Sequence, residues 1–159
     1  MPSFLPGAQH LQNIHPIVVH FPIAFLLGAA FFYFFGGIFR KEAWIVTGFW
    51  MLVAGFLTLL AAGATGLYAE SGVMVSRSVR EHLLERHERF MIVTAVLCAV
   101  LIVWAIIARP LPKKGLLGFA ALFLLMLLTL TLGADFGGRM VYEYNAGGYA
   151  CSQPIEFKN

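Results

Sequence analysis

Long apolar runs separated by short polar stretches dominate this chain. The runs predict four membrane-spanning helices, at about residues 16–39, 43–68, 89–108 and 115–134. Each run is long enough to cross about 30 Å of hydrocarbon at about 1.5 Å per residue. The expected fold class is therefore an all-α integral membrane protein, with four transmembrane helices in an up-down-up-down bundle.

The polar stretches refine this prediction. Residues 76–89 are charged and helix-prone, so they predict an interfacial helical extension before the third span, with Ser76 or Ser78 as its N-cap. Pro22 lies inside the first span and should distort that helix locally. The Gly-Gly doublets that begin with Gly137-Gly138 predict turns, in a polar exterior tail over residues 135–159. The whole chain, 1–159, is expected to form a single membrane domain.

Composition supports a membrane protein independently of any motif. The chain is 60% hydrophobic and 12% charged, whereas soluble domains are about one quarter charged. The net charge of +3 is spread over loops rather than along one face, so no nucleic-acid partner is indicated. The partner that the composition does predict is membrane lipid.

The distribution of basic residues predicts the orientation. The two short connections around residues 40–42 and 109–114 carry five basic residues and one acidic residue, whereas the three longer segments on the other side carry six basic and seven acidic residues. Positive charge in short loops marks the cytoplasmic side. Both termini, residues 69–89 and all five histidines are therefore expected on the exterior side of a bacterial inner membrane, in the periplasm if the source has two membranes.

Two histidine pairs carry the candidate chemistry. His15 and His20 stand at the mouth of the first span, and His82 and His87 repeat their five-residue spacing at the mouth of the third. Imidazole is costly beside hydrocarbon unless it is paired, hydrated or bound. Spans one and three enter from the same side and are diagonal partners in such a bundle, so the pairs should converge. Because five residues rotate a helix by about 140°, one member of each pair should point inward.

This arrangement predicts a bis-imidazole haem b between spans one and three near the exterior face. The deeper histidines, His20 and His87, are the preferred axial ligands. His15 and His82 are the alternates, or contacts for a haem propionate or a quinone. Four further side chains at the same mouth are candidate cofactor contacts: Arg86, Arg89, Arg139 and Tyr142. The expected function is a small electron-transfer subunit that passes electrons between a periplasmic cytochrome or oxidoreductase and quinone or a larger membrane complex.

Two alternatives stay open. The histidines, with Glu85 or Glu88, could hold Zn or Cu in a metal-handling membrane protein. They could also be hydrated interfacial imidazoles in a non-redox structural or anchor subunit. The sequence has no C-x-x-C-H, so covalent c-type haem is excluded, and it has no P-loop, nucleophile elbow or paired catalytic acids. No catalytic residue is therefore predicted, and a complex subunit is favoured over a stand-alone enzyme.

Two motifs resemble those of a known family. HPIVVHFPIA at 15–24 is similar to the opening signature of a bacterial four-span membrane family of unassigned function, a "domain of unknown function" family, and GGRMVYEY at 137–144 is similar to its closing motif. The resemblance extends to a histidine at the start of the third span, here His87 or His82. It implies the four-span fold and the membrane location. Proteins of this family occur near cytochromes and periplasmic oxidoreductases, so the resemblance also favours a haem.

Overall fold

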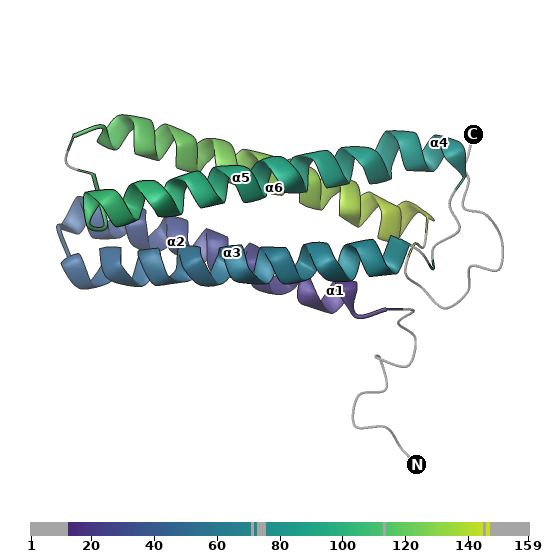
Figure 1. Cartoon of the computed structure of the whole chain (residues 1–159), viewed down its shortest axis with the longest axis horizontal. Helices are drawn as coiled ribbons and strands as arrows, with labels where there is room; N and C mark the ends of the chain where they lie inside the picture. Colours follow the sequence, from purple (N-terminus) through teal and green to yellow (C-terminus); the bar gives the residue numbers. More distant parts are fainter. Residues whose placement is uncertain (1–12, 71, 73–75, 113, 145, 147–159) are drawn as a thin grey trace, which may run out of the picture.

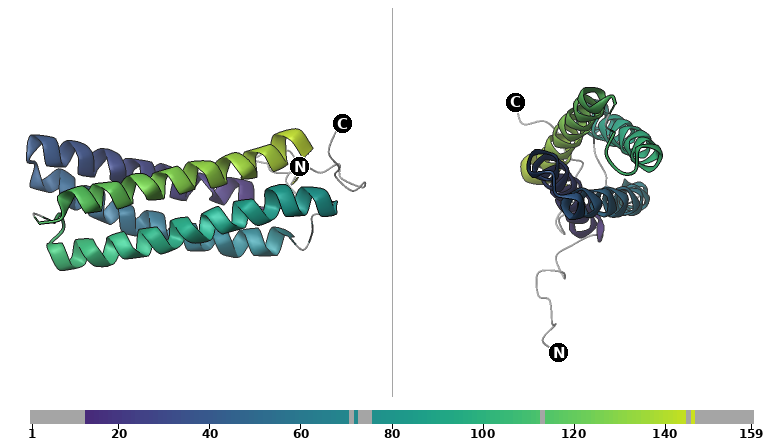
Figure 2. Two further views of the ribbon diagram at one scale, coloured as in Figure 1. Left: turned by 90° about the horizontal axis from the view of Figure 1, so that it is seen from above. Right: turned by 90° about the vertical axis from the view of Figure 1, so that its left-hand side faces the viewer.

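The computed structural model describes residues 13–70, 72, 76–112, 114–144 and 146, in which four long helices lie side by side (Figures 1 and 2). The elements are α1 His15–Val18, α2 His20–Phe39, α3 Glu42–Glu70, α4 Arg77–Val79, the π-helix η2 Arg80–Leu84, α5 Glu85–Ala108 and α6 Leu116–Tyr144. They make four helical segments that are long and apolar enough to cross a membrane: 15–39, 42–70, 77–108 and 116–144. The predicted fold class, all-α with four membrane-spanning helices, is confirmed.

The bundle consists of two helical hairpins. α3 packs along α2, and α6 packs along α5, while α3–α5 and α2–α6 contacts join the hairpins. Within the described residues α2 and α5 share no helix–helix contact, so they are diagonal. The Tyr33 hydroxyl donates to the carbonyl of Pro110, 3.3 Å away at one end of the bundle, and His15 lies beside His87 at the other. α2 and α5 therefore run in the same direction.

The buried positions of each helix recur at alternating intervals of three and four residues. The main inward positions are 22, 26, 29, 33 and 36 in α2, then 48, 52, 55, 59 and 62 in α3, then 94, 98, 101 and 105 in α5, and 119, 123, 126, 130 and 133 in α6. This is the spacing of about 3.5 residues at which helices interdigitate in a left-handed bundle. The remaining positions are just as apolar, because in a membrane the outer surface faces lipid.

Glycines allow the helices of each hairpin to approach closely. A Cβ at Gly48 would lie 3.1 Å from the backbone nitrogen of Tyr33, and one at Gly55 would lie 2.5 Å from a methyl of Leu26. In α6, Gly133 lies against Phe90 and Met91 of α5 in the same way. Because lipid supplies no hydrophobic drive between membrane helices, such contacts carry much of the association.

The third span begins with the helical extension that the sequence predicts. Ser76 caps this helix, since its hydroxyl accepts from the Val79 N–H at 3.4 Å. α4, η2 and α5 then form one continuous helical segment over residues 77–108. At the first span, helix α1 ends at Val18 and α2 begins at His20. This interruption lies where Pro22, which has no N–H, leaves the Val18 carbonyl without its helical donor.

The end of the fourth span differs from its prediction. α6 continues ten residues beyond the expected boundary at 134, so the predicted turn at Gly137-Gly138 is wrong. These glycines lie inside a helix that packs against α5, where Gly137 touches the ring of His87. Packing of this kind offsets the cost of about 1 kcal/mol that glycine carries in a helix. Apart from residue 146, the rest of the predicted tail, including Gly147-Gly148, lies outside the described residues.

Two adjacent glycines near the end of α2 test this packing, because their substitutions should have opposite effects. A Cβ at Gly36 would lie 3.0 Å from the backbone nitrogen of Ile45, whereas a Cβ at Gly37 would meet nothing within 4 Å. We expect Gly36→Ala to destabilise the protein by about 1–3 kcal/mol. Gly37→Ala should be neutral or stabilising by up to about 1 kcal/mol. Denaturant unfolding in mild detergent measures both, and equal effects of the two substitutions would refute the close α2–α3 contact.

Candidate histidine site between the two hairpins

The structure brings His15 and His87 together. Their ring centroids lie 6.4 Å apart and their planes are nearly perpendicular, at 87°. His15 belongs to α1 at the entrance of the first span, and His87 belongs to α5 near the entrance of the third. Both side chains are partly buried. The expected convergence of the first and third spans is thus present, through one histidine from each sequence pair.

Hydrogen bonds identify the nitrogen that carries the proton in each neutral ring. His87 Nδ1 lies 2.7 Å from the carbonyl oxygen of Gly133, which only accepts, so Nδ1–H donates. His15 Nδ1 lies 3.1 Å from Thr65 Oγ1, whose own proton is directed at the Ala62 carbonyl 2.9 Å away. His15 therefore also donates from Nδ1. Both Nε2 atoms keep their lone pairs, which is the form in which imidazole binds a metal.

Glycines form the surface on which each imidazole rests. A Cβ at Gly66 of α3 would lie 3.0 Å from His15 Cε1, and a Cβ at Gly137 of α6 would lie 3.1 Å from both Cε1 and Nδ1 of His87. Any larger residue at either position would displace its ring. The role of these two glycines beneath the histidines was not predicted from the sequence. Their spacing could have revealed it. Gly66 follows the inward position 62 of α3 by four residues, and Gly137 follows the inward position 133 of α6 by four residues.

The other two predicted histidines lie elsewhere. His20 is exposed on α2, and within the described part of the chain no hydrogen bond, ion pair or ring contact is found for its side chain. His82 is exposed in η2, and its Nδ1 lies 2.9 Å from the Ser78 carbonyl of its own helical turn. The described structure thus pairs His87 with His15, the shallower member of its sequence pair, rather than with His20.

An ion pair joins η2 to the end of α3 near the histidine end of the bundle. Arg80 of η2 pairs with Glu70 at the end of α3, and the adjacent Leu83 is almost completely buried. η2 is a π-helix, which adds a residue to a turn and is frequent at functional sites. Through the Arg80–Glu70 pair, η2 links the segment that precedes α5 to the end of α3.

The arginines predicted to contact the cofactor lie on α5 and α6, and they already have partners. Arg89 pairs with Glu85 at 3.4 Å, and Arg139 pairs with Glu143 at 3.0 Å, each on its own helix. The Arg86 guanidinium lies 5.9 Å from the ring centroid of Phe136. Tyr142, also predicted to contact the cofactor, is 90% exposed. Exposed ion pairs of this kind contribute about 0–1 kcal/mol, so these arginines can exchange partners at low cost.

The arrangement provides two nitrogen ligands. Over the described ranges, no group of three or more His, Cys, Asp or Glu side chains is placed to hold a metal ion. A bare Zn site generally takes four ligands, three of them from protein even when a position stays open for water.

The protonation of the two rings can be measured directly. In cofactor-free protein with ¹⁵N-labelled histidine, at a pH of about 8, well above the usual imidazole pKa of about 6.5, we expect His15 and His87 to carry the proton on Nδ1. Thr65→Val removes the acceptor of His15 only, so it should shift the tautomer of His15 and leave that of His87 unchanged. Multiple-bond ¹H–¹⁵N spectra report both rings, and a proton on Nε2 of His87 would contradict this assignment.

Comparison with known proteins identifies the family of the chain. Residues 11–149 match the family described as "Predicted membrane protein (DUF2231)", and this match includes His15, Thr65, His87 and Gly137. No curated protein and no solved structure matches the chain. The chain therefore belongs to this family of membrane proteins, whose function is unknown.

Proposed function

We propose that this protein is a small electron-transfer subunit of the bacterial inner membrane, in which His15 and His87 hold a haem b near the exterior face. One observation carries the proposal: the imidazoles of His15 in α1 and His87 in α5 lie with their ring centroids 6.4 Å apart, and each has its Nδ1 hydrogen-bonded, which leaves Nε2 as the nitrogen for a metal. The ligand pair differs from the sequence-based preference, His20 and His87, because His20 is exposed on α2.

The spacing of the rings supports a shared ion. Two imidazoles bound to one metal through nitrogens at about 2 Å would have centroids about 6 Å apart, and the observed separation is 6.4 Å. The bonds at Nδ1 support the same interpretation, since metal-bound histidines generally donate their second N–H to a carbonyl or a comparable acceptor. Gly66 and Gly137 keep the surroundings of both rings free of side-chain bulk.

The protein's part in such a function is to hold and orient the haem, which itself supplies reversible one-electron transfer. The carbonyl of Gly133 and the hydroxyl of Thr65 fix the ring orientations and increase the basicity of both imidazoles. Arg86, Arg89 and Arg139 are the cations available to propionates at the exterior surface. We place electron exchange between an exterior redox partner and the quinone pool or a larger membrane complex.

Absorption spectra test the haem and its ligands together. Reduced, detergent-purified protein should show sharp α and Soret bands. His15→Ala and His87→Ala should each lower the haem content by at least about tenfold, whereas the matched variants His20→Ala and His82→Ala should retain it. His15→Met should keep six-coordinate iron at a higher reduction potential, because a thioether axial ligand raises the potential.

Two results would overturn this proposal in different ways. A colourless protein with no bound metal by elemental analysis would leave a structural or anchor subunit. Loss of the bands in His20→Ala but not in His15→Ala would restore the ligand pair preferred from the sequence.

The proposed orientation has its own test. Arg40, Lys41, Arg109 and Lys114 lie in or next to the connections at the end of the bundle away from the histidine pair, and we place that end in the cytoplasm. In spheroplasts, a membrane-impermeant maleimide should label Cys151, whereas Cys98 is fully buried and should not react. In a Cys151→Ser background, Lys114→Cys should react only after permeabilisation. Labelling of Lys114→Cys in intact spheroplasts would reverse the orientation.

A further inference from the structure

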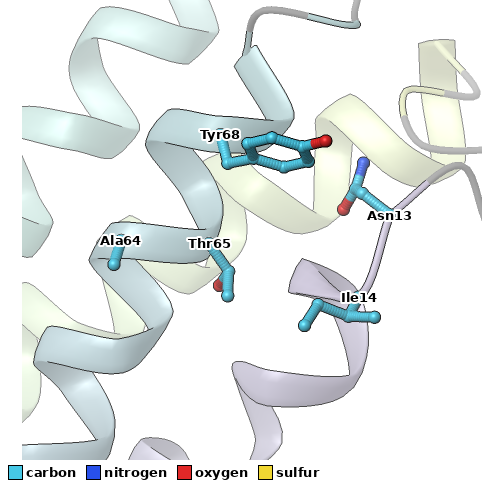
Figure 3. Close-up of a pocket in the computed structure, with 5 residues that line it drawn as sticks. All are labelled: Asn13, Ile14, Ala64, Thr65 and Tyr68. Atoms are coloured by element: carbon cyan, nitrogen blue, oxygen red, sulfur yellow. The ribbon is translucent and has the colours of Figure 1, made fainter.

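Cavities lie at both ends of the bundle, and they differ in charge. The cavity at the histidine end is lined by Asn13, Ile14, Ala64, Thr65 and Tyr68 (Figure 3). None of these side chains is charged. A second cavity lies at the opposite end, where α5 ends and α6 begins, and two cations line it. The second cavity therefore has a means of selecting a ligand by charge that the first does not have.

The second cavity combines an apolar side with a cationic side. Its volume is about 380 Å³, within the range of about 300–1,000 Å³ that is usual for small-molecule sites. Trp104, Ile107 and Ala108, in the last turns of α5, line the apolar side. Arg109 and Lys114, in the connection to α6, line the cationic side. The apolar side thus belongs to a membrane span, and the cationic side lies where that span ends.

Two glycines at the start of the fourth span hold the Trp104 indole in place. A Cβ at Gly115 would lie 3.1 Å from Trp104 Cζ2, and one at Gly118 would lie 3.2 Å from Cη2. The indole also meets the Phe119 ring edge-on, with the centroids 5.8 Å apart. Trp104 is therefore a packed wall of the cavity, at the membrane boundary where tryptophan is enriched. Ile107, which is 75% exposed, extends this wall toward the lipid.

The two cations have no anionic partner in the described part of the chain. Arg109 and Lys114 are exposed, and no ion pair or hydrogen bond of either side chain is found there. At the histidine end, by contrast, Arg80, Arg89 and Arg139 each pair with a carboxylate. Arg109 and Lys114 are thus available to an anion from outside these residues, and guanidinium and ammonium groups both bind phosphate.

We infer that this cavity binds an anionic phospholipid. The lipid phosphate would lie between Arg109 and Lys114, and an acyl chain would lie along Trp104 and Ile107. A free phosphate ion would use the cations alone, and a neutral lipid would use the apolar wall alone. Basic pockets between membrane helices bind anionic headgroups in this way. The inference does not depend on the haem, because the cavity lies at the other end of the bundle from the histidine pair.

Quenching by brominated lipids tests this inference, because bromine on an acyl chain quenches a tryptophan that it contacts. Trp44→Phe and Trp50→Phe leave Trp104 as the only tryptophan of the full-length protein, which is placed in phosphatidylcholine bilayers at a salt concentration of about 0.15 M. We expect brominated phosphatidylglycerol to be preferred at Trp104 over brominated phosphatidylcholine by about tenfold. Arg109→Gly and Lys114→Gln should each lower this preference by about fivefold.

A matched control separates the cavity from the general positive charge of this end of the bundle. Arg109 and Arg40 both have a left-handed backbone, with φ of 54° and 52°, and each ends a helix. Glycine adopts this conformation readily, so Arg109→Gly and Arg40→Gly each remove one charge and keep the backbone. Arg40 does not line the cavity, and Arg40→Gly should change the lipid preference by less than about twofold.

Three results would overturn the site. Equal quenching of Trp104 by the two brominated lipids would remove the selectivity. An equal loss in Arg40→Gly and Arg109→Gly would assign the preference to the charge of the whole surface. Abolition of the preference by excess glycerol 3-phosphate would make the occupant a free phosphate. Thermal unfolding checks the variants, and Lys114→Gln, at an exposed residue outside the helices, provides the test even if Arg109→Gly does not fold.

Discussion

The close approach of two helices within each hairpin is the constraint on which the rest of this structure depends. α3 meets α2 at Gly48 and Gly55, and the same seam ends at Gly66, on which His15 rests. The seam between α5 and α6 passes Gly133 and ends at Gly137, beneath His87. Each hairpin therefore presents one histidine over one glycine, and the contacts that hold the helices together in lipid also determine where the imidazoles lie.

Each imidazole is hydrogen-bonded within its own hairpin. His15 uses Nδ1 for α3 through Thr65, and His87 uses Nδ1 for α6 through the Gly133 carbonyl. Each hairpin thus satisfies one nitrogen of its own histidine. Among the described residues no fully buried side-chain nitrogen or oxygen lacks a hydrogen-bond partner. The second nitrogen of each partly buried ring therefore keeps access to solvent or to a ligand.

Most of the fold was predictable from the sequence, because four apolar runs of sufficient length leave few alternatives in a membrane. The depth of the site was also predictable, since both histidine pairs stand at span entrances. Which histidines point into the bundle was not predicted. When a helix is apolar on every side, the pattern of hydrophobic residues does not show which side packs against the other helices. Gly137-Gly138 was misread for a related reason: glycine favours turns and close helix packing alike, and the local sequence does not separate the two.

The spacing of the inward positions along α2 and α5 nevertheless separates His15 and His87 from His20 and His82. The inward positions of α2, extended backward from Pro22 by three and then four residues, reach Val19 and His15, and those of α5 extend from Thr94 to Met91 and His87. His20 and His82 fall outside both registers. Gly36, Gly48, Gly55 and Thr94 lie on this register, but Gly37 and Gly63, where a Cβ would meet open space, do not. A single small or polar residue therefore does not identify the inward face of such a helix. The spacing of the buried positions by three and four residues does, and the two histidines in phase with it are those that lie side by side.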